Sequence, residues 1–225
     1  MSAAHDRWEC LDVDVLGDAG TSPSGVLYLH GWDEDKASLV EFAEATLPAA
    51  GHALLPTLRG HGHGPRPATG YAPADFAADL QRTFWDRPPL QVVGYSYGAL
   101  VALSYAVNVG PHRVPSVTLL DQALFADISR RVGGEWAEAS AMKWEFDYTH
   151  QVRAAVAVGI DVLLVVAEES SVVGPAERDF WLDQPADGLR VCRVPGDHRG
   201  LVRGPAHAVA VTRQFLSEAH DRMAR

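Results

Sequence analysis

The feature that most restricts how this chain can fold is the pentapeptide Gly94-Tyr95-Ser96-Tyr97-Gly98. It follows a short apolar run at 90–93 and precedes a helix-like apolar run at 99–106. A strand can pass into a helix through so sharp a turn only if the flanking residues are small, and both glycines meet that need. The turn presents Ser96 beside a helix N-terminus, which stabilises negative charge. The pattern predicts a reactive serine; the alternative is that Ser96 is no more than a polar residue in a glycine-rich turn.

Short apolar runs alternate with helical patterns along the rest of the chain. The runs predicted to be strands are 9–16, 25–29, 53–56, 90–93, 116–120, 161–166 and 190–194. The segments predicted to be helices are 36–50, 73–85, 97–109 and 205–224. This alternation predicts an α/β fold with a doubly wound, mostly parallel sheet. Because no linker or internal repeat divides the chain, we expect residues 1–225 to form a single domain.

Several residues with reactive side chains come directly after predicted strands. Ser96, Asp121 and His198 each hold such a position, and so does the segment His30-Gly31-Trp32. In doubly wound sheets the carboxyl ends of the strands meet at one edge, where ligands bind. We therefore expect these residues to lie close together.

A serine hydroxyl is a poor nucleophile at neutral pH, so it needs a neighbouring base, and the base needs an acid that orients it. We assign His198 as the base because it lies in a glycine-flanked loop after the last predicted strand. We assign Asp121 as the acid because it ends the strand that follows the serine. Glu168 and Glu169, which follow the strand at 161–166, remain alternatives for the acid.

Acyl transfer by a serine also needs hydrogen-bond donors for the developing oxyanion. The backbone N–H of Tyr97 can supply one donor, and we expect the N–H of Trp32 to supply the second. We interpret His30 as a structural histidine that braces the loop containing Trp32. The residues expected around the substrate pocket are His30, Tyr95, Trp136 and Trp144.

Charge and composition exclude several classes of partner. The formal net charge is −10 and no basic patch stands out, which argues against nucleic acid or an anionic membrane. The first seven residues lack the apolar core of a signal peptide, and no apolar run is long enough to span a bilayer. We therefore expect a cytoplasmic protein whose two cysteines, Cys10 and Cys192, are reduced.

Two histidines raise the question of a metal. His61 and His63 stand two residues apart in a glycine-rich loop, which does not guarantee that both side chains lie on one face. No cluster of carboxylates or cysteines accompanies them, and neither common phosphate-binding glycine motif is present. We expect no metal and no cofactor.

With these motifs the chain resembles the α/β-hydrolase superfamily. The motifs that carry the resemblance are His30-Gly31, Arg59-Gly60-His61-Gly62, the serine pentapeptide and Gly196-Asp197-His198. The resemblance runs from about residue 25 to the C-terminal helix. It implies the α/β-hydrolase fold with a short cap at 122–155, inserted after the sixth strand. It also implies a serine esterase or thioesterase that forms a covalent acyl-enzyme.

The acid departs from the usual pattern of the superfamily. In most members the acid follows the strand after the cap, but here the matching segment is Ala167-Glu168-Glu169-Ser170, which has a serine at that position. The position of Asp121, one strand earlier, resembles the thioesterase domains of polyketide and nonribosomal peptide synthases. The turn that contains His198 is similar to theirs, whereas the segments 30–32 and 59–62 look more like those of ordinary carboxylesterases.

The resemblance implies cleavage of an acyl ester or thioester, in a small molecule or on a carrier protein, by a monomer or homodimer. Two alternatives stay open. One is a non-hydrolytic enzyme of secondary metabolism on the same fold, which performs acyl transfer, macrolactone formation or elimination. The other is a ligand-binding protein that has lost catalysis.

Overall fold

The computed structural model of the chain describes residues 11–17, 25–48, 51–125, 148–184, 186–204 and 206–223. Its strands are β1 (Val13–Leu16), β2 (Gly25–Leu29), β3 (His52–Pro56), β4 (Leu90–Tyr95), β5 (Ser116–Leu120), β6 (Asp161–Glu169) and β7 (Leu189–Asp197). Its helices are the 3₁₀ helix η1 (Lys36–Leu39) and the α-helices α1 (Val40–Thr46), α2 (Pro73–Phe84), α3 (Tyr97–Val109), α5 (Thr149–Ala157), α6 (Pro175–Leu182), α7 (Gly200–Arg203) and α8 (Ala206–Met223).

The described strands form one sheet in the order β1-β3-β2-β4-β5-β6-β7. β1 is antiparallel to β3, and the other neighbouring pairs are parallel. The predicted doubly wound, mostly parallel sheet is therefore confirmed. The chain leaves β2 towards one side of the sheet and continues from β4 towards the other. The crevice between the carboxyl ends of β2 and β4 is thus the point where ligands bind in such sheets.

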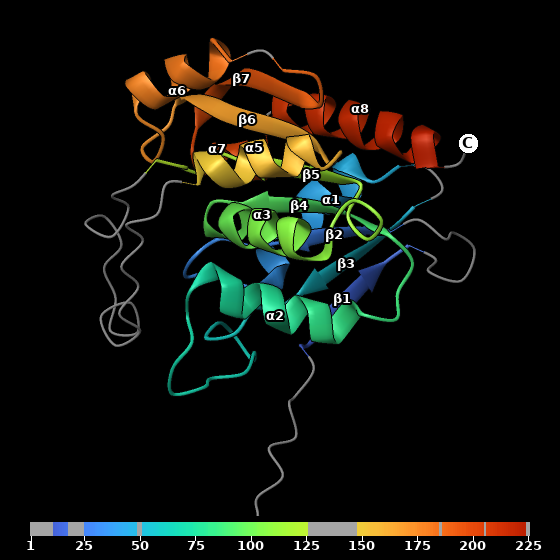
Figure 1. The fold of residues 1–225 in the computed structure, drawn as a ribbon. Coiled ribbons are helices and arrows are strands. Elements are labelled where there is room, and N and C mark those ends of the chain that lie inside the picture. The colour runs from blue at the N-terminus through green and yellow to red at the C-terminus, as the bar shows by residue number, and fades with distance from the viewer. Residues whose placement is uncertain are drawn as a thin grey trace, which may run out of the picture.

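Helices cover both faces of the sheet (Figure 1). Alternate residues of β2 point to opposite faces, so Leu27 and Leu29 pack in one apolar cluster while Val26 and Tyr28 pack in the other. The first cluster contains buried residues of α2, α3 and α5, and the second contains buried residues of α1 and α8. Burial on both faces explains why the central strands are almost continuously apolar in sequence.

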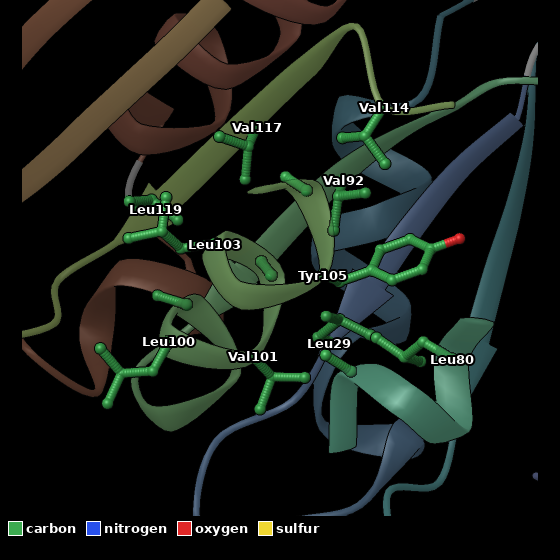
Figure 2. Packing of buried hydrophobic residues seen from close by; sticks show 14 of the residues in the cluster. Leu29, Leu80, Val92, Leu100, Val101, Leu103, Tyr105, Val114, Val117 and Leu119 are labelled. Carbon is green, nitrogen blue, oxygen red and sulfur yellow. The ribbon is translucent and has the colours of Figure 1, made fainter. Parts of the chain in front are cut away.

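The first cluster fixes α3 on the sheet (Figure 2). Leu100, Val101 and Leu103 of α3 are fully buried and lie beside sheet residues such as Val92 and Leu119. α3 is apolar on nearly every side because α2 and α5 also pack around it. The helix that begins directly after Ser96 is therefore one of the most deeply buried elements of the fold.

Some element predictions need correction. The helix predicted at 36–50 is a 3₁₀ turn followed by a short α-helix that ends at Thr46. β6 continues to Glu169 and β7 to Asp197, because their exposed ends still pair with each other. The short helices α5, α6 and α7 were not predicted, since helices of this length depend on packing more than on sequence pattern.

The predicted cap at 122–155 is described only at its two ends. Residues 126–147, which include Trp136 and Trp144, lie outside the described residues. The segment follows β5, the fifth described strand along the chain and not the sixth. Its last part belongs to α5, which buries Val152 and Ala155 in the first cluster.

None of the described helices combines the length and the apolar character needed to cross a membrane. Cys192 is a half-buried free thiol, and Cys10 lies outside the described residues.

Candidate active site

Ser96 lies in the turn between β4 and α3, in a backbone conformation that is rare for a residue with a side chain. Its φ is 52° and its ψ is −126°. Its N–H donates to Leu120 O at 2.9 Å, and its carbonyl accepts from Ala99 N at 2.8 Å, so both sides of the turn are held. Gly94 and Gly98 allow this geometry: a Cβ at Gly94 would lie 2.3 Å from Gly98 O, and one at Gly98 would lie 2.3 Å from Leu29 O.

A continuous line of hydrogen bonds joins Ser96, His198 and Asp121. His198 Nε2 lies 3.1 Å from Ser96 Oγ, and His198 Nδ1 lies 2.8 Å from Asp121 Oδ2. The side chain of His198 is 14% exposed and that of Asp121 is fully buried. Residues from the ends of β4, β5 and β7 thus meet at one edge of the sheet, as expected from their positions in the sequence.

Asp121 is held by donors on both carboxylate oxygens. Oδ1 accepts from Ala167 N at 2.8 Å, and Oδ2 accepts from Ser170 Oγ at 2.7 Å as well as from His198. The residue has a φ of 48°, and its own N–H donates to Val165 O at 2.8 Å. A buried carboxyl group needs such hydrogen-bond partners, because burying polar atoms without partners is costly. The sequence analysis places Ser170 where most members of the superfamily have the acid, but it does not predict the hydrogen bond from Ser170 to Asp121.

The two glutamates left open as alternative acids lie elsewhere. Glu168 Oε1 is 3.4 Å from Arg193 Nε, and both Glu168 and Glu169 are exposed. The carboxylate at hydrogen-bond distance from His198 is that of Asp121.

Tyr95 was expected in the substrate pocket, but it lies against His198. Its ring is buried and stacks on the imidazole, with 5.0 Å between centroids and 27° between planes. Its hydroxyl donates to His198 O at 3.0 Å. Burial raises the pKa of Tyr95, and the negative charges of Glu34 and Asp121 raise it further, so the hydroxyl remains a donor. Tyr95 therefore supports His198 from the sheet side.

His30 is fully buried, and its ring contacts backbone groups of two loops. Its Nε2 accepts from Leu58 N at 3.0 Å, which puts the ring proton on Nδ1, 2.8 Å from Gly31 O. Burial lowers the pKa of His30 to about 4. The imidazole is therefore neutral and ties the loop after β2 to the segment after β3.

Glu34 organises the loop that was expected to supply an oxyanion donor. Its Oε2 accepts from Gly31 N at 3.3 Å and from Ser38 Oγ at 3.1 Å. A Cβ at Gly31 would lie 3.1 Å from Ser96 Cβ and 3.3 Å from Glu34 Oε2, so this loop runs directly against the serine. Sequence reasoning missed Glu34, because a glutamate in a surface loop carries no distinguishing pattern.

The two residues expected to supply the oxyanion donors are neighbours in space. The rings of Trp32 and Tyr97 are in edge-to-face contact, with 5.2 Å between centroids. Tyr97 is the first residue of α3, and its hydroxyl donates to Tyr71 O at 2.9 Å. Trp32 also contacts the ring of His61 at 5.9 Å between centroids. This aromatic contact fixes the loop after β2 against the start of α3.

A cavity of about 540 Å³ opens beside this loop. Its lining is dominated by charged and polar side chains, among them two arginines and three carboxylates. Glu34 belongs to the lining, and its Oε1 lies 3.9 Å from Arg203 Nη2. The lining residues are Asp33, Glu34, Asp35, Ser38, Gly60, His61, Gly62, Arg66 and Arg203. Such a lining suits a polar or charged group of a ligand more than an alkyl chain.

The two histidines of the glycine-rich loop, His61 and His63, lie in different surroundings. His61 is buried, with Nδ1 2.8 Å from Arg59 O, and burial lowers its pKa, whereas His63 is exposed. In the part of the chain that the structure describes, no group of three His, Cys, Asp or Glu side chains is placed to hold a metal ion.

Arg59, from the same loop, has a structural position. Its guanidinium donates to both carboxylate oxygens of Asp79 on α2 and to Gly70 O. Burial alone would lower the pKa of Arg59, but the bonds to Asp79 raise it above its ordinary value. The motif 59–62 thus clamps the loop after β3 onto α2.

Comparisons with known proteins agree on the fold. A model of the alpha/beta hydrolase family matches residues 26–225. No curated protein sequence matches the chain. Three solved structures that it resembles are an alpha/beta hydrolase from Novosphingobium aromaticivorans, a thermophilic esterase from Thermogutta terrifontis and the thioesterase domain from the curacin biosynthetic pathway.

These likenesses cover nearly whole chains at low identity. The Novosphingobium hydrolase is 16% identical, with a TM-score of 0.72, and the match covers 92% of this chain and 93% of that one. The Thermogutta esterase is 17% identical, with a TM-score of 0.67 and coverage of 93% and 94%. The curacin thioesterase domain is 18% identical, with a TM-score of 0.61 and coverage of 91% and 99%.

Proposed function

The chain belongs to the alpha/beta hydrolase family, and from this premise we propose that it is a serine hydrolase that cleaves an acyl ester or thioester through an acyl-enzyme. The observation that carries the proposal is the line of hydrogen bonds from Asp121 through His198 to Ser96. Nucleophile, base and orienting acid are each within hydrogen-bond reach of the next, which is the geometry that this chemistry needs.

The first step is attack by Ser96. Asp121 Oδ2 accepts a hydrogen bond from the N–H at His198 Nδ1, so the lone pair of Nε2 faces Ser96 Oγ at 3.1 Å. As Oγ bonds to the substrate carbonyl carbon, Nε2 takes its proton, and Asp121 stabilises the resulting imidazolium. The imidazolium then gives that proton to the leaving oxygen or sulfur, and the acyl group stays on Ser96.

The carbonyl oxygen becomes negatively charged during the attack and needs donors that are already oriented. We assign this role to the backbone N–H groups of Tyr97 and Trp32. Tyr97 begins α3, so its N–H belongs to the positive end of the helix dipole. The hydrogen bond from Gly31 to Glu34 and the contact between the Trp32 and Tyr97 rings support a loop of fixed shape.

The second step releases the acyl group. A water gives a proton to His198 Nε2 as its oxygen attacks the acyl carbon, and the bond to Ser96 Oγ breaks as Oγ takes that proton back. The products are a carboxylic acid and the free enzyme. An internal hydroxyl or another acceptor in place of water would give a ring or a transferred acyl group.

The polar cavity beside Glu34 is not lined by Ser96, His198 or Asp121, so it does not identify the group next to the scissile bond. The proposed substrate is a small molecule in the cytoplasm or an acyl group on a carrier protein. The position of the acid directly after β5 supports the thioesterase form of the proposal, whereas the chemistry at Ser96 is the same for an ester.

A fluorophosphonate probe tests the proposal directly. We expect intact mass spectrometry to detect one adduct on the wild type and none on Ser96→Ala. Ser171→Ala, which removes an exposed serine, serves as the matched control and should label like the wild type. An unlabelled wild type would contradict an activated serine and favour a ligand-binding protein.

Product analysis in ¹⁸O-labelled water separates hydrolysis from its alternative. Hydrolysis of an ester and thioester panel places one labelled oxygen in the released acid. A product without label would indicate transfer or ring closure by the same acyl-enzyme.

A further inference from the structure

We propose that Ser170 is a positioning residue, whose hydroxyl holds the carboxylate of Asp121 in the orientation that accepts the hydrogen bond from His198 Nδ1. The inference rests on the proposed function of Ser96, His198 and Asp121. It starts from one atom: Asp121 Oδ2 lies 2.7 Å from Ser170 Oγ and 2.8 Å from His198 Nδ1. Ser170 does not touch the reacting serine and acts through Asp121.

The backbone around Ser170 decides which way its proton points. Ser170 Oγ accepts the N–H of Val172 at 3.1 Å and the N–H of Val173 at 2.8 Å. These two bonds occupy both lone pairs of the hydroxyl oxygen. The hydroxyl proton is then directed to Asp121 Oδ2, which as a carboxylate oxygen can only accept. Ser170 is therefore a donor of fixed orientation.

The turn that carries Ser170 is itself anchored. Ser170 N donates to Ala167 O at 3.3 Å, and Arg178 of α6 donates to Ala167 O at 3.2 Å and to Glu168 O at 2.8 Å. Ala167 N in turn donates to Asp121 Oδ1. One rigid turn at the end of β6 thus supplies a donor to each oxygen of the carboxylate.

Apart from the imidazole itself, the donors to the carboxylate are Ala167 N on Oδ1 and Ser170 Oγ on Oδ2, and together they set the plane of the carboxylate independently of His198. Ala167 N alone holds one oxygen and leaves the position of Oδ2 to the side chain that Asp121 has to orient. Without the Ser170 hydroxyl, Oδ2 would keep only the bond to His198, and rotation about χ2 of Asp121 would misalign that bond. The buried carboxylate would also lose one of its three hydrogen-bond donors. The expected result is a poorly oriented His198, and hence slower chemistry at Ser96 with unchanged substrate binding.

The kinetic test compares Ser170→Ala with Ser170→Thr, which keeps a hydroxyl, and with Ser171→Ala as the neighbouring control. On an ester that the wild type hydrolyses, we expect Ser170→Ala to lower kcat by about tenfold to a hundredfold, as for loss of a hydrogen bond to a charged group. KM should change by less than about twofold, because the hydroxyl binds no substrate. Ser170→Thr should recover most of kcat. A kcat for Ser170→Ala equal to that of the wild type would overturn the proposal.

A second readout does not depend on catalysis. A proton held between an imidazole nitrogen and a buried carboxylate gives a low-field ¹H NMR signal. We expect this signal of His198 in the wild type, Ser96→Ala, Ser171→Ala and Ser170→Thr, and its loss or broadening in Ser170→Ala. Melting temperatures of the same variants show that each has folded.

The two readouts separate the possible failures. A wild type that no probe labels, but whose low-field signal disappears in Ser170→Ala, would contradict the proposed function and still support the positioning role. A signal that is absent from the wild type, or equally strong in Ser170→Ala, would contradict the positioning role whatever the enzyme hydrolyses.

Discussion

Three non-glycine residues among those described have a positive φ, and all three belong to the site or its rim: Asp33, Ser96 and Asp121. Such a conformation is unfavourable for a residue with a Cβ, so it persists only where the surroundings enforce it. For Ser96 and Asp121 the enforcement is visible, since each N–H bonds to the carbonyl of the next strand in the sheet. The strain coincides with the proposed nucleophile and acid, and it supports their assignment independently of the side-chain distances.

Asp121→Asn tests the acid. The asparagine NH₂ can donate to His198 Nδ1 and so favour the wrong tautomer, with the proton on Nε2, where it cannot accept from Ser96. We expect kcat to fall by roughly 10⁴-fold, as in serine proteases, with little change in KM. The measurement is steady-state hydrolysis of an ester substrate.

Asp197→Asn is the matched control, because Asp197 is exposed and its Oδ1 accepts from Gly200 N. It should leave kcat within a few-fold of the wild type. Full activity in Asp121→Asn would make Asp121 structural and return attention to Glu168 and Glu169.

His30 should make folding stability depend on pH. Its pKa is about 4 in the folded protein, against an ordinary value of 6.5. Between these values the unfolded chain binds the proton and the folded one does not, so the free energy of unfolding falls as the pH falls. The contribution is fully present above pH 6.5, amounts to about 3 kcal/mol, and is lost by about pH 4. His61, whose pKa burial also lowers, acts in the same direction.

Urea unfolding at several pH values measures this dependence. His30→Gln should flatten the slope between pH 6.5 and pH 4, whereas His63→Gln, which changes an exposed histidine, should keep it. An identical slope in the wild type and His30→Gln would show that His30 is not the group that titrates.

At the scale of single residues, the sequence was most informative where a side chain follows directly after a strand. Ser96, Asp121 and His198 could be placed at one sheet edge because parallel strands end on the same side. The surroundings of Tyr95 and His30 could not be predicted, because their partners, His198 O and Leu58 N, lie 103 and 28 residues away. The sequence showed only that Ser170 occupies the position where most members of the superfamily have an acid. Its bond to Asp121 could not be predicted, because it depends on how the ends of β5 and β6 lie relative to each other.

At the scale of elements, α3 crosses β2 at very close range beside the site. A Cβ at Gly98 would lie 2.3 Å from Leu29 O and 2.5 Å from His30 O, both backbone atoms that cannot turn aside. Gly98→Ala should therefore push α3 away from β2 and destabilise the fold by about 3 kcal/mol, as overpacking does. Urea denaturation measures the change.

Gly174→Ala is the control for that substitution. Gly174 precedes α6 in an extended conformation, and nothing lies within 4 Å of a Cβ placed there. Its stability should stay within about 0.5 kcal/mol of the wild type. Equal stability of the two alanine variants would mean that α3 can cross β2 at a wider distance than it does in the structure.

The elements that the sequence predicted well are those buried on both sides. The apolar runs of β2 and β5 and the helix α3 have the bounds expected from the sequence. α6 starts with Pro175 but went unpredicted, because it is short and because its buried face also includes a glutamate: Glu177 accepts from Leu124 N and Phe125 N. A charged residue that faces inward hides the amphipathic pattern on which such predictions depend.

At the scale of the whole molecule, the two described ends of the insertion after β5 lie next to each other. Tyr148 N donates to Leu124 O at 2.7 Å, so the chain on either side of residues 126–147 is already joined by a hydrogen bond. Glu177 holds the first side, and α5 packs the second into the core. We therefore regard residues 1–225 as a single domain with an inserted segment, a division that remains a proposal.

Excision tests this division. Replacing residues 126–147 by a short Gly–Ser linker should leave the melting temperature within a few degrees and keep labelling of Ser96 by the fluorophosphonate probe. Calorimetry and intact mass measure both. A variant that fails to fold would show that the insertion belongs to the core.

The backbone hydrogen bonds of Ser96 and Asp121 have a consequence for the thermal inactivation of the protein. Both N–H groups extend the ladder between central parallel strands, to Leu120 O and Val165 O. Their deuterium exchange should be as slow as that of the innermost strands, because these amides open only when the sheet opens. Thermal inactivation should then coincide with the loss of the sheet and not precede it. Residual activity would therefore measure the fraction of molecules that are still folded.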